Sequence, residues 1–172
     1  MRPSLSAWDW NHGINNSGYL TQVAARLRGG LPAGPVVIVG HSAGAAAGAW
    51  IAAALLEAGT NVRRVVMVDG VESPAGLIRR AWPRLGRVDV VDVCGEPSRC
   101  NRDGALVGWL QAQDRPVTIV PIAGAGHGDI EGGSSAIYRW ACGDTSSEET
   151  RAEVLAHVVS AVLIGLAVTP VR

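Results

Sequence analysis

Short valine-rich runs alternate along this chain with longer stretches of helical composition, and turn residues separate the two kinds of segment. Apolar runs bounded by glycine, proline or polar residues are predicted as strands: 4–10, 36–40, 62–68, 87–94 and 117–122. Helices are predicted between and after them: 18–27, 45–58, 105–113 and a last helix that runs to about Val168. A capping box of Ser146 and Glu149 is expected to start that last helix.

This order predicts an α/β fold with a mostly parallel sheet of about five strands and helices on both faces, because parallel neighbours need crossover helices. The 172 residues are most simply one domain, spanning 1–172. Loops at the carboxyl ends of parallel strands gather at one edge of the sheet, so functional residues are expected there.

Charge and hydropathy narrow the range of partners. The 15 basic and 15 acidic side chains balance, which gives no basic surface for nucleic acid. The arginine-rich segment 79–87 is interpreted as a solvated connection. The most apolar stretch, 154–168, is shorter than the roughly 20 residues of a membrane-spanning helix. We therefore predict no stable membrane span and a helix buried in the core. No apolar signal-peptide core follows Met1.

The segment Gly40-His41-Ser42-Ala43-Gly44 stands between a predicted strand and a predicted helix. It matches the G-x-S-x-G pattern, in which glycines flanking a tight strand-to-helix turn let the two elements approach closely. Such a turn presents the hydroxyl of Ser42 above the sheet edge as a nucleophile. The main-chain N–H of Ala43 would then point at the oxyanion that develops during acyl transfer.

A serine nucleophile needs a base, and the chain offers four histidines. His127 follows the last predicted strand, where the chain order serine, acid, histidine places the base. His41 lies inside the turn and should point away from the hydroxyl. His157 lies on the apolar last helix and is expected in the core, while His12 lies in an N-terminal loop. We therefore predict that His127 is the base.

Two carboxylates compete for the role of the acid that orients His127. Asp69 ends the strand after the serine turn, and Glu96 follows the next strand, so both lie at the same sheet edge as the base. Asp92 and Asp103 are less favoured, because Asp92 is inside a strand and Asp103 is inside a turn. The residues alone leave Asp69 and Glu96 as alternatives.

The chain resembles the chlorophyllase-like and dienelactone-hydrolase-like branch of the α/β-hydrolases. The matching pieces are Gly40-His41-Ser42-Ala43-Gly44, Val68-Asp69-Gly70, Glu96-Pro97-Ser98-Arg99-Cys100-Asn101, Gly126-His127-Gly128-Asp129-Ile130-Glu131 and Cys142-Gly143. The resemblance implies hydrolysis of carboxylic esters with an apolar part, without a cofactor. It carries the acid onto Asp69, although the segment reads Asp69-Gly70-Val71-Glu72 where the family usually has Asp-Pro-Val-Asp.

In one respect the chain departs from that family. Family members carry a longer N-terminal part, including a strand and a His-Gly loop that supply the second oxyanion donor, whereas only 41 residues precede Ser42. We expect a minimal or truncated hydrolase, or a replacement of that loop by His12-Gly13. An unpaired sheet edge at 4–10 would invite pairing between two copies of the chain, so a homodimer is expected to form there.

Three cysteines, Cys94, Cys100 and Cys142, leave one thiol unpaired if a disulfide forms, and their spacing matches no metal site. The family resemblance implies a Cys100–Cys142 bridge in a chain that matures in an oxidising compartment and is secreted. Three free thiols would instead indicate a cytoplasmic protein.

The leading functional hypothesis is a serine-dependent esterase in which Ser42 attacks, His127 transfers the proton, Asp69 orients His127 and Ala43 binds the oxyanion. A thioesterase or acyltransferase would use the same residues. The alternative from another class is a weakly active or non-catalytic relic that acts as a binding module.

Overall fold

The computed structural model describes residues 12–129, 140–142 and 147–167, and a parallel sheet lies at its centre. In this part of the chain four strands lie in the order β1-β2-β3-β4: β1 (Val36–His41), β2 (Val62–Val68), β3 (Asp89–Cys94) and β4 (Thr118–Pro121). The α/β class and the parallel sheet are therefore confirmed. The fifth predicted strand, at 4–10, lies outside the described residues.

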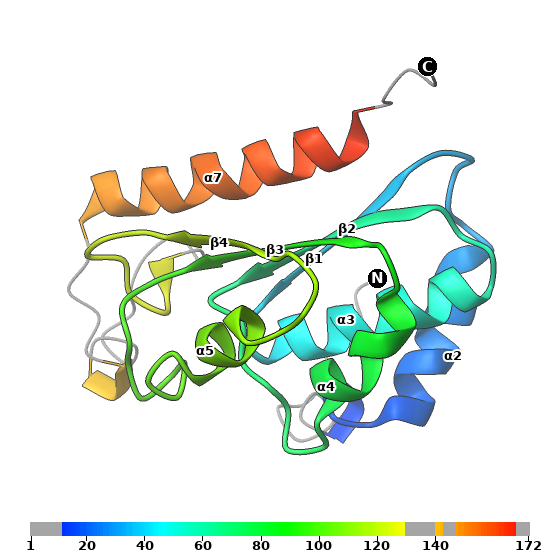
Figure 1. Ribbon diagram of the computed structural model, residues 1–172, viewed down its shortest axis with the longest axis horizontal. Helices are drawn as coiled ribbons and strands as arrows, with labels where there is room; N and C mark the ends of the chain where they lie inside the picture. Colours follow the sequence, from blue (N-terminus) through cyan, green and yellow to red (C-terminus); the bar gives the residue numbers. More distant parts are fainter. Residues whose placement is uncertain (1–11, 130–139, 143–146, 168–172) are drawn as a thin grey trace, which may run out of the picture.

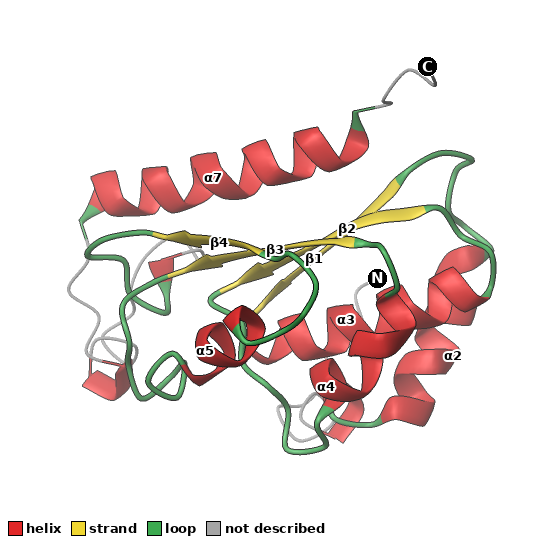
Figure 2. Ribbon diagram, viewed as in Figure 1, coloured by secondary structure: helices red, strands yellow, loops and turns green. Residues whose placement is uncertain are grey.

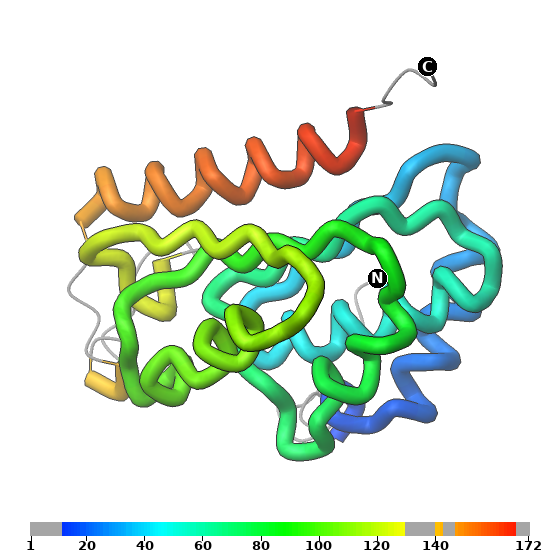
Figure 3. The backbone as a smooth tube through the Cα atoms, in the orientation of Figure 1, coloured from blue at the N-terminus to red at the C-terminus, as the bar shows by residue number. Residues whose placement is uncertain are grey.

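Helices cover both faces of the sheet (Figures 1 and 2). One layer holds α2 (Ser17–Arg28), α3 (Ala43–Glu57), α4 (Leu77–Ala81), the short 3-10 helix η1 (Trp82–Leu85) and α5 (Ala105–Gln111). The other face carries α7 (Glu148–Leu166), which crosses β1, β2 and β3 (Figure 3). The sheet therefore separates two apolar clusters, one under each helical layer.

Alanine lets α3 lie close to the sheet. Its buried face is built largely of alanines that are almost fully inaccessible, among them Ala45, Ala46, Ala49 and Ala52. Contact is tight enough that a Cβ on Gly48 would lie 3.2 Å from Ile38 Cγ2. Close approach of this helix brings its N-terminus directly to the end of β1.

The last helix differs from its prediction in two ways. Its N-cap is Ser147, whose hydroxyl accepts a hydrogen bond from Thr150 N at 3.1 Å, so the helix begins at Glu148. Only one stripe of the helix is buried against the sheet, and His157 is exposed rather than in the core. An apolar composition does not distinguish a helix buried all round from one that covers a sheet with a single face. None of the helices in the described ranges is both long and apolar enough to span a membrane.

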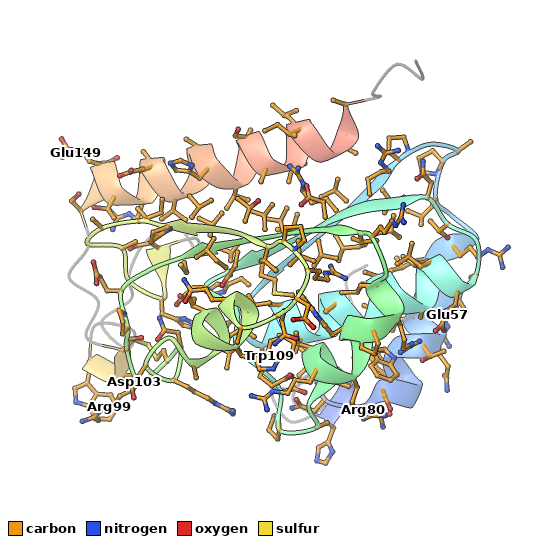
Figure 4. The ribbon with its side chains drawn as sticks, in the orientation of Figure 1. Glu57, Arg80, Arg99, Asp103, Trp109 and Glu149 are labelled. Atoms are coloured by element: carbon orange, nitrogen blue, oxygen red, sulfur yellow. A yellow bond between two sulfur atoms is a disulfide. The ribbon has the colours of Figure 1, made fainter. Side chains whose placement is uncertain are left out.

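The arginine-rich segment 79–87 is largely exposed, as expected, but it is helical: it contains the end of α4 and all of η1. Arg84 makes two hydrogen bonds to Glu57, at 2.7 and 2.8 Å, and its guanidinium lies 4.4 Å from the centre of the Trp50 ring. Arg80 stacks on the same ring at 4.9 Å. Figure 4 shows Arg80 and Glu57 on the helical layer that contains α3 and α4. Both arginines therefore pack on the Trp50 ring, and Arg84 also pairs with a carboxylate.

Candidate active site

Ser42 occupies the turn between β1 and α3 with φ 54° and ψ −128°. A positive φ is unfavourable for a residue with a side chain and persists only where its surroundings hold it. Here Ser42 N donates to Val68 O at 3.0 Å, and Ser42 O accepts from Ala45 N and Val71 N at 3.0 and 3.1 Å. The turn is thus fixed from both β2 and α3.

Gly40 is required by the same turn. A Cβ at this position would lie 2.3 Å from Gly44 O and 2.6 Å from Gly44 C, which are main-chain atoms that cannot move aside. At Gly44, in contrast, a Cβ would meet nothing within 4 Å. The two glycines of the pattern therefore have different roles.

We expect Gly40→Ala to lower the free energy of unfolding by at least about 3 kcal/mol, because the added methyl overlaps the main chain of α3. Urea unfolding measures this loss. Gly44→Ala is the matched control and should keep or slightly raise stability, since alanine favours a helix. Equal effects at the two positions would contradict the prediction.

His127 connects Ser42 to Asp69. Its Nε2 lies 2.9 Å from Ser42 Oγ, and its Nδ1 lies 2.5 Å from Asp69 Oδ2. Because a carboxylate only accepts hydrogen bonds, Nδ1 donates to Asp69, and Nε2 is then the ring atom that can accept the proton of the Ser42 hydroxyl. His127 and Asp69 are each 5% exposed. The predicted hydrogen bond between His127 and Asp69 is therefore present.

Asp69 is held as firmly as Ser42. It has φ 44°, and its main-chain N–H donates to Val93 O at 2.7 Å. Its second carboxylate oxygen, Oδ1, accepts from Gly95 N at 3.2 Å and from Asn101 Nδ2 at 3.0 Å. These donors fix the carboxylate in place with Oδ2 towards His127.

Asn101 was given no role from the sequence, although this residue ends one of the pieces that carry the family resemblance. Its amide nitrogen donates to Asp69 and to Glu96 O, the latter at 2.8 Å. Its amide oxygen accepts from Ser98 N and Gly104 N at 2.8 and 3.0 Å. A buried asparagine with all these partners orders the loop after β3 around the Asp69 carboxylate. The spacing of Asn101 and Gly104 was the available signal, because an asparagine side chain often accepts a hydrogen bond from a nearby main-chain N–H in a turn.

Glu96, the alternative acid, contacts the main chain of Gly124. Its Oε1 accepts from Gly124 N at 3.2 Å, so the side chain joins the loop after β3 to the loop after β4. Glu96 N also donates to Ala125 O at 2.8 Å. Glu96 therefore helps to position the loop that carries His127.

His41 contacts the main chain of the other histidine. Its Nε2 lies 2.7 Å from His127 O, and because a carbonyl only accepts, Nε2 must carry the proton and donate it. The two rings lie 4.9 Å apart at an angle of 41°. His41 thus holds the backbone at His127, a role that the sequence pattern did not indicate.

A cavity of about 760 Å³ adjoins Ser42 and Ala43. Ala43 is the first residue of α3, and an N–H at that position has no acceptor within its own helix. Gly13 and Ile14 line the same cavity, so the segment before α2 reaches the site. A second oxyanion donor from this segment, as proposed for His12-Gly13, stays a prediction.

Asp92 is a fully buried carboxyl group in β3. Its Oδ1 accepts one long hydrogen bond, from Gly70 N at 3.4 Å, and Oδ2 has no partner among the described residues. Burial raises the pKa of Asp92 to about 7, opposed by the Gly70 N–H and reinforced by the charge of Asp69. The group therefore holds a proton in the folded state where the unfolded chain has lost it.

Asp92 is expected to make stability fall as pH rises from about 4 to about 7. Across this window the folded state binds one proton more than the unfolded chain, so the free energy of unfolding decreases with pH. Asp92→Asn should gain stability relative to the native protein across the same window, and the difference should be constant above it. Urea unfolding at several pH values measures this slope. Asp103→Asn, at an exposed carboxylate, is the control; an unchanged slope in Asp92→Asn would refute the prediction.

Cys100 and Cys142 form a disulfide, and Cys94 is a buried free thiol, as predicted. The bridge joins the loop after β3, which contains Asn101, to the segment that follows the His127 loop. Figure 4 shows Arg99 and Asp103 on that loop. Burial raises the pKa of Cys94 to about 12, which keeps this thiol protonated.

Protein made under oxidising conditions should show one reactive thiol when unfolded without reductant and three after reduction. Reduction should cost about 4 kcal/mol of stability in the loop-closure model for a separation of 42 residues. Thiol titration and urea unfolding measure the two effects. In Cys94→Ala no reactive thiol should remain before reduction. Three thiols without reductant would show that the bridge does not form.

No group of three or more His, Cys, Asp or Glu side chains in the described part of the chain is arranged to hold a metal ion.

Comparison with protein-family models, with curated proteins and with solved structures finds no match to this chain. The arrangement of Ser42, His127 and Asp69 therefore has to be interpreted from its own chemistry.

Proposed function

We propose that the protein is a serine-dependent carboxylic ester hydrolase of the α/β-hydrolase type. The observation that carries this proposal is the hydrogen-bonded chain from the hydroxyl of Ser42 through the His127 ring to the Asp69 carboxylate. A strained serine at a helix N-terminus, a base in hydrogen-bond reach and a buried acid behind it are the parts that acyl transfer needs.

In this mechanism Ser42 Oγ attacks the ester carbonyl carbon while His127 Nε2 takes the hydroxyl proton. Asp69 stabilises the resulting imidazolium, and the N–H of Ala43 binds the oxyanion. The carbon–oxygen bond to the alcohol then breaks, and His127 protonates the leaving alkoxide. Water attacks the acyl-enzyme with the same base, releasing the acid and restoring Ser42.

The order of the elements supports the resemblance to the α/β-hydrolases and to their chlorophyllase-like and dienelactone-hydrolase-like branch. The serine follows β1, the acid follows β2 and the histidine follows β4, so all three lie at the carboxyl edge of a parallel sheet. The cavity beside Ser42 is mostly apolar, which favours an ester with an apolar part.

A fluorophosphonate probe tests the proposal, because it phosphonylates only an activated serine. Folded protein should be labelled at Ser42, located by mass spectrometry of the modified peptide, while unfolded protein and Ser42→Ala should not be labelled. Absence of labelling in folded wild-type protein would instead support a binding module without catalysis.

A further inference from the structure

The cavity beside Ser42 extends along the open edge of the sheet. It is lined by Val37 and Val39 of β1 on one side and by side chains of α2 and α3 on the other, including Val23, Leu27 and Ile51. In the described part of the chain β1 pairs with β2 alone, so its other edge has no neighbouring strand.

The main-chain groups that point into this groove follow from the alternation of a strand. Ser42 N donates to Val68 O, so the N–H and C=O groups of Ile38 and Gly40, an even number of residues away, also face β2. Those of Val37 and Val39 must face the open edge. Within the described residues, neither of them has a strand partner there.

These polar groups favour one kind of occupant over another. A plain alkyl chain would fill the groove but would cover the N–H and C=O groups of Val37 and Val39 without bonding to them, which is unfavourable. An extended chain of amides satisfies them as an added strand would. None of the described residues that line the groove is acidic or arginine, so the side chains of such a ligand that face α2 and α3 should be apolar.

We propose that the groove binds the acyl part of the substrate as an extended peptide, parallel to β1, with the reacting carbonyl at Ser42. This inference rests on the proposed ester hydrolysis at Ser42. A chain that ends in the carbonyl at Ser42 and extends back to Val37 spans five residues of β1, about 16 Å, which holds four to five peptide residues. The substrate class is therefore a peptidyl ester with apolar side chains.

The test compares p-nitrophenyl esters on the wild-type protein. An N-acetylated tetrapeptidyl ester of apolar residues should have kcat/KM at least about tenfold above that of an unbranched acyl ester of equal length. Methylating single amide nitrogens of the peptide should lower kcat/KM by about tenfold at alternate positions and by less than about twofold at the positions between. This alternation is specific to strand pairing, because a loss of apolar contact would not depend on whether the methylated position is odd or even along the peptide.

Val39→Pro provides a second measurement on the protein side. Proline removes the outward N–H of Val39, which is not part of the ladder with β2, and an edge strand tolerates proline there. The ratio of kcat/KM for the peptidyl ester to that for p-nitrophenyl acetate should fall at least about fivefold, with folding checked by circular dichroism. The methylated substrates remain informative if this variant does not fold.

Equal rates on alkyl and peptidyl esters, or methylation effects without alternation, would overturn the peptide proposal. So would a wild-type dimer that Val39→Pro converts to a monomer, because a second copy would then occupy the edge. Failure of the proposed hydrolase is recognised separately, by absent fluorophosphonate labelling and absent acetate hydrolysis.

Discussion

Alanine in place of Ser42 is expected to lower the turnover of p-nitrophenyl acetate at least about a thousandfold. The nucleophile is lost, and water held beside His127 replaces it poorly. The fold should remain, because the Ser42 hydroxyl makes no capping hydrogen bond to α3. Steady-state kinetics with circular dichroism measures both effects.

Ser147→Ala is the matched control, since Ser147 is also a serine at a helix N-cap. Its hydroxyl does accept from Thr150 N, so this variant should lose about 1 kcal/mol of stability but keep its turnover. Near-normal activity in folded Ser42→Ala would refute the mechanism.

Asp69→Asn is expected to lower kcat by about four orders of magnitude. An amide that donates to His127 Nδ1 would force the ring proton onto Nε2, and Nε2 could then no longer accept the proton of Ser42. The Asn101 amide that now donates to Asp69 would also meet a weaker acceptor. Kinetics on an activated ester measures the loss.

Glu96→Gln provides the comparison that separates the two candidate acids. A glutamine oxygen can still accept from Gly124 N, so the loop should keep its conformation and kcat should stay within about threefold. A larger loss in Glu96→Gln than in Asp69→Asn would assign the acid to Glu96 and contradict the structural interpretation.

Much of the fold could be predicted because its signals are local. The strand at 62–68 was predicted with the bounds that the structure has. A short run of β-branched residues between turn residues is typical of a buried strand, and the turn residues mark its ends. The turn at Ser42 was equally predictable, because the glycine at position 40 reflects a contact only four residues away. The start of the last helix was misplaced by one residue because Ser146 and Ser147 are equally good caps.

The sequence by itself determined the alternation of strands and helices, the serine turn and the position of His127 after the last strand. The residues alone left Asp69 and Glu96 open and the family resemblance favoured Asp69, but only the tertiary structure shows that Asp69 contacts His127 while Glu96 contacts Gly124, because both follow strands at one sheet edge and differ in where their side chains point. It also decided the roles of Asn101 and His41. Those roles depend on hydrogen bonds between segments 32 and 86 residues apart, and neither periodicity nor propensity carries information over that separation.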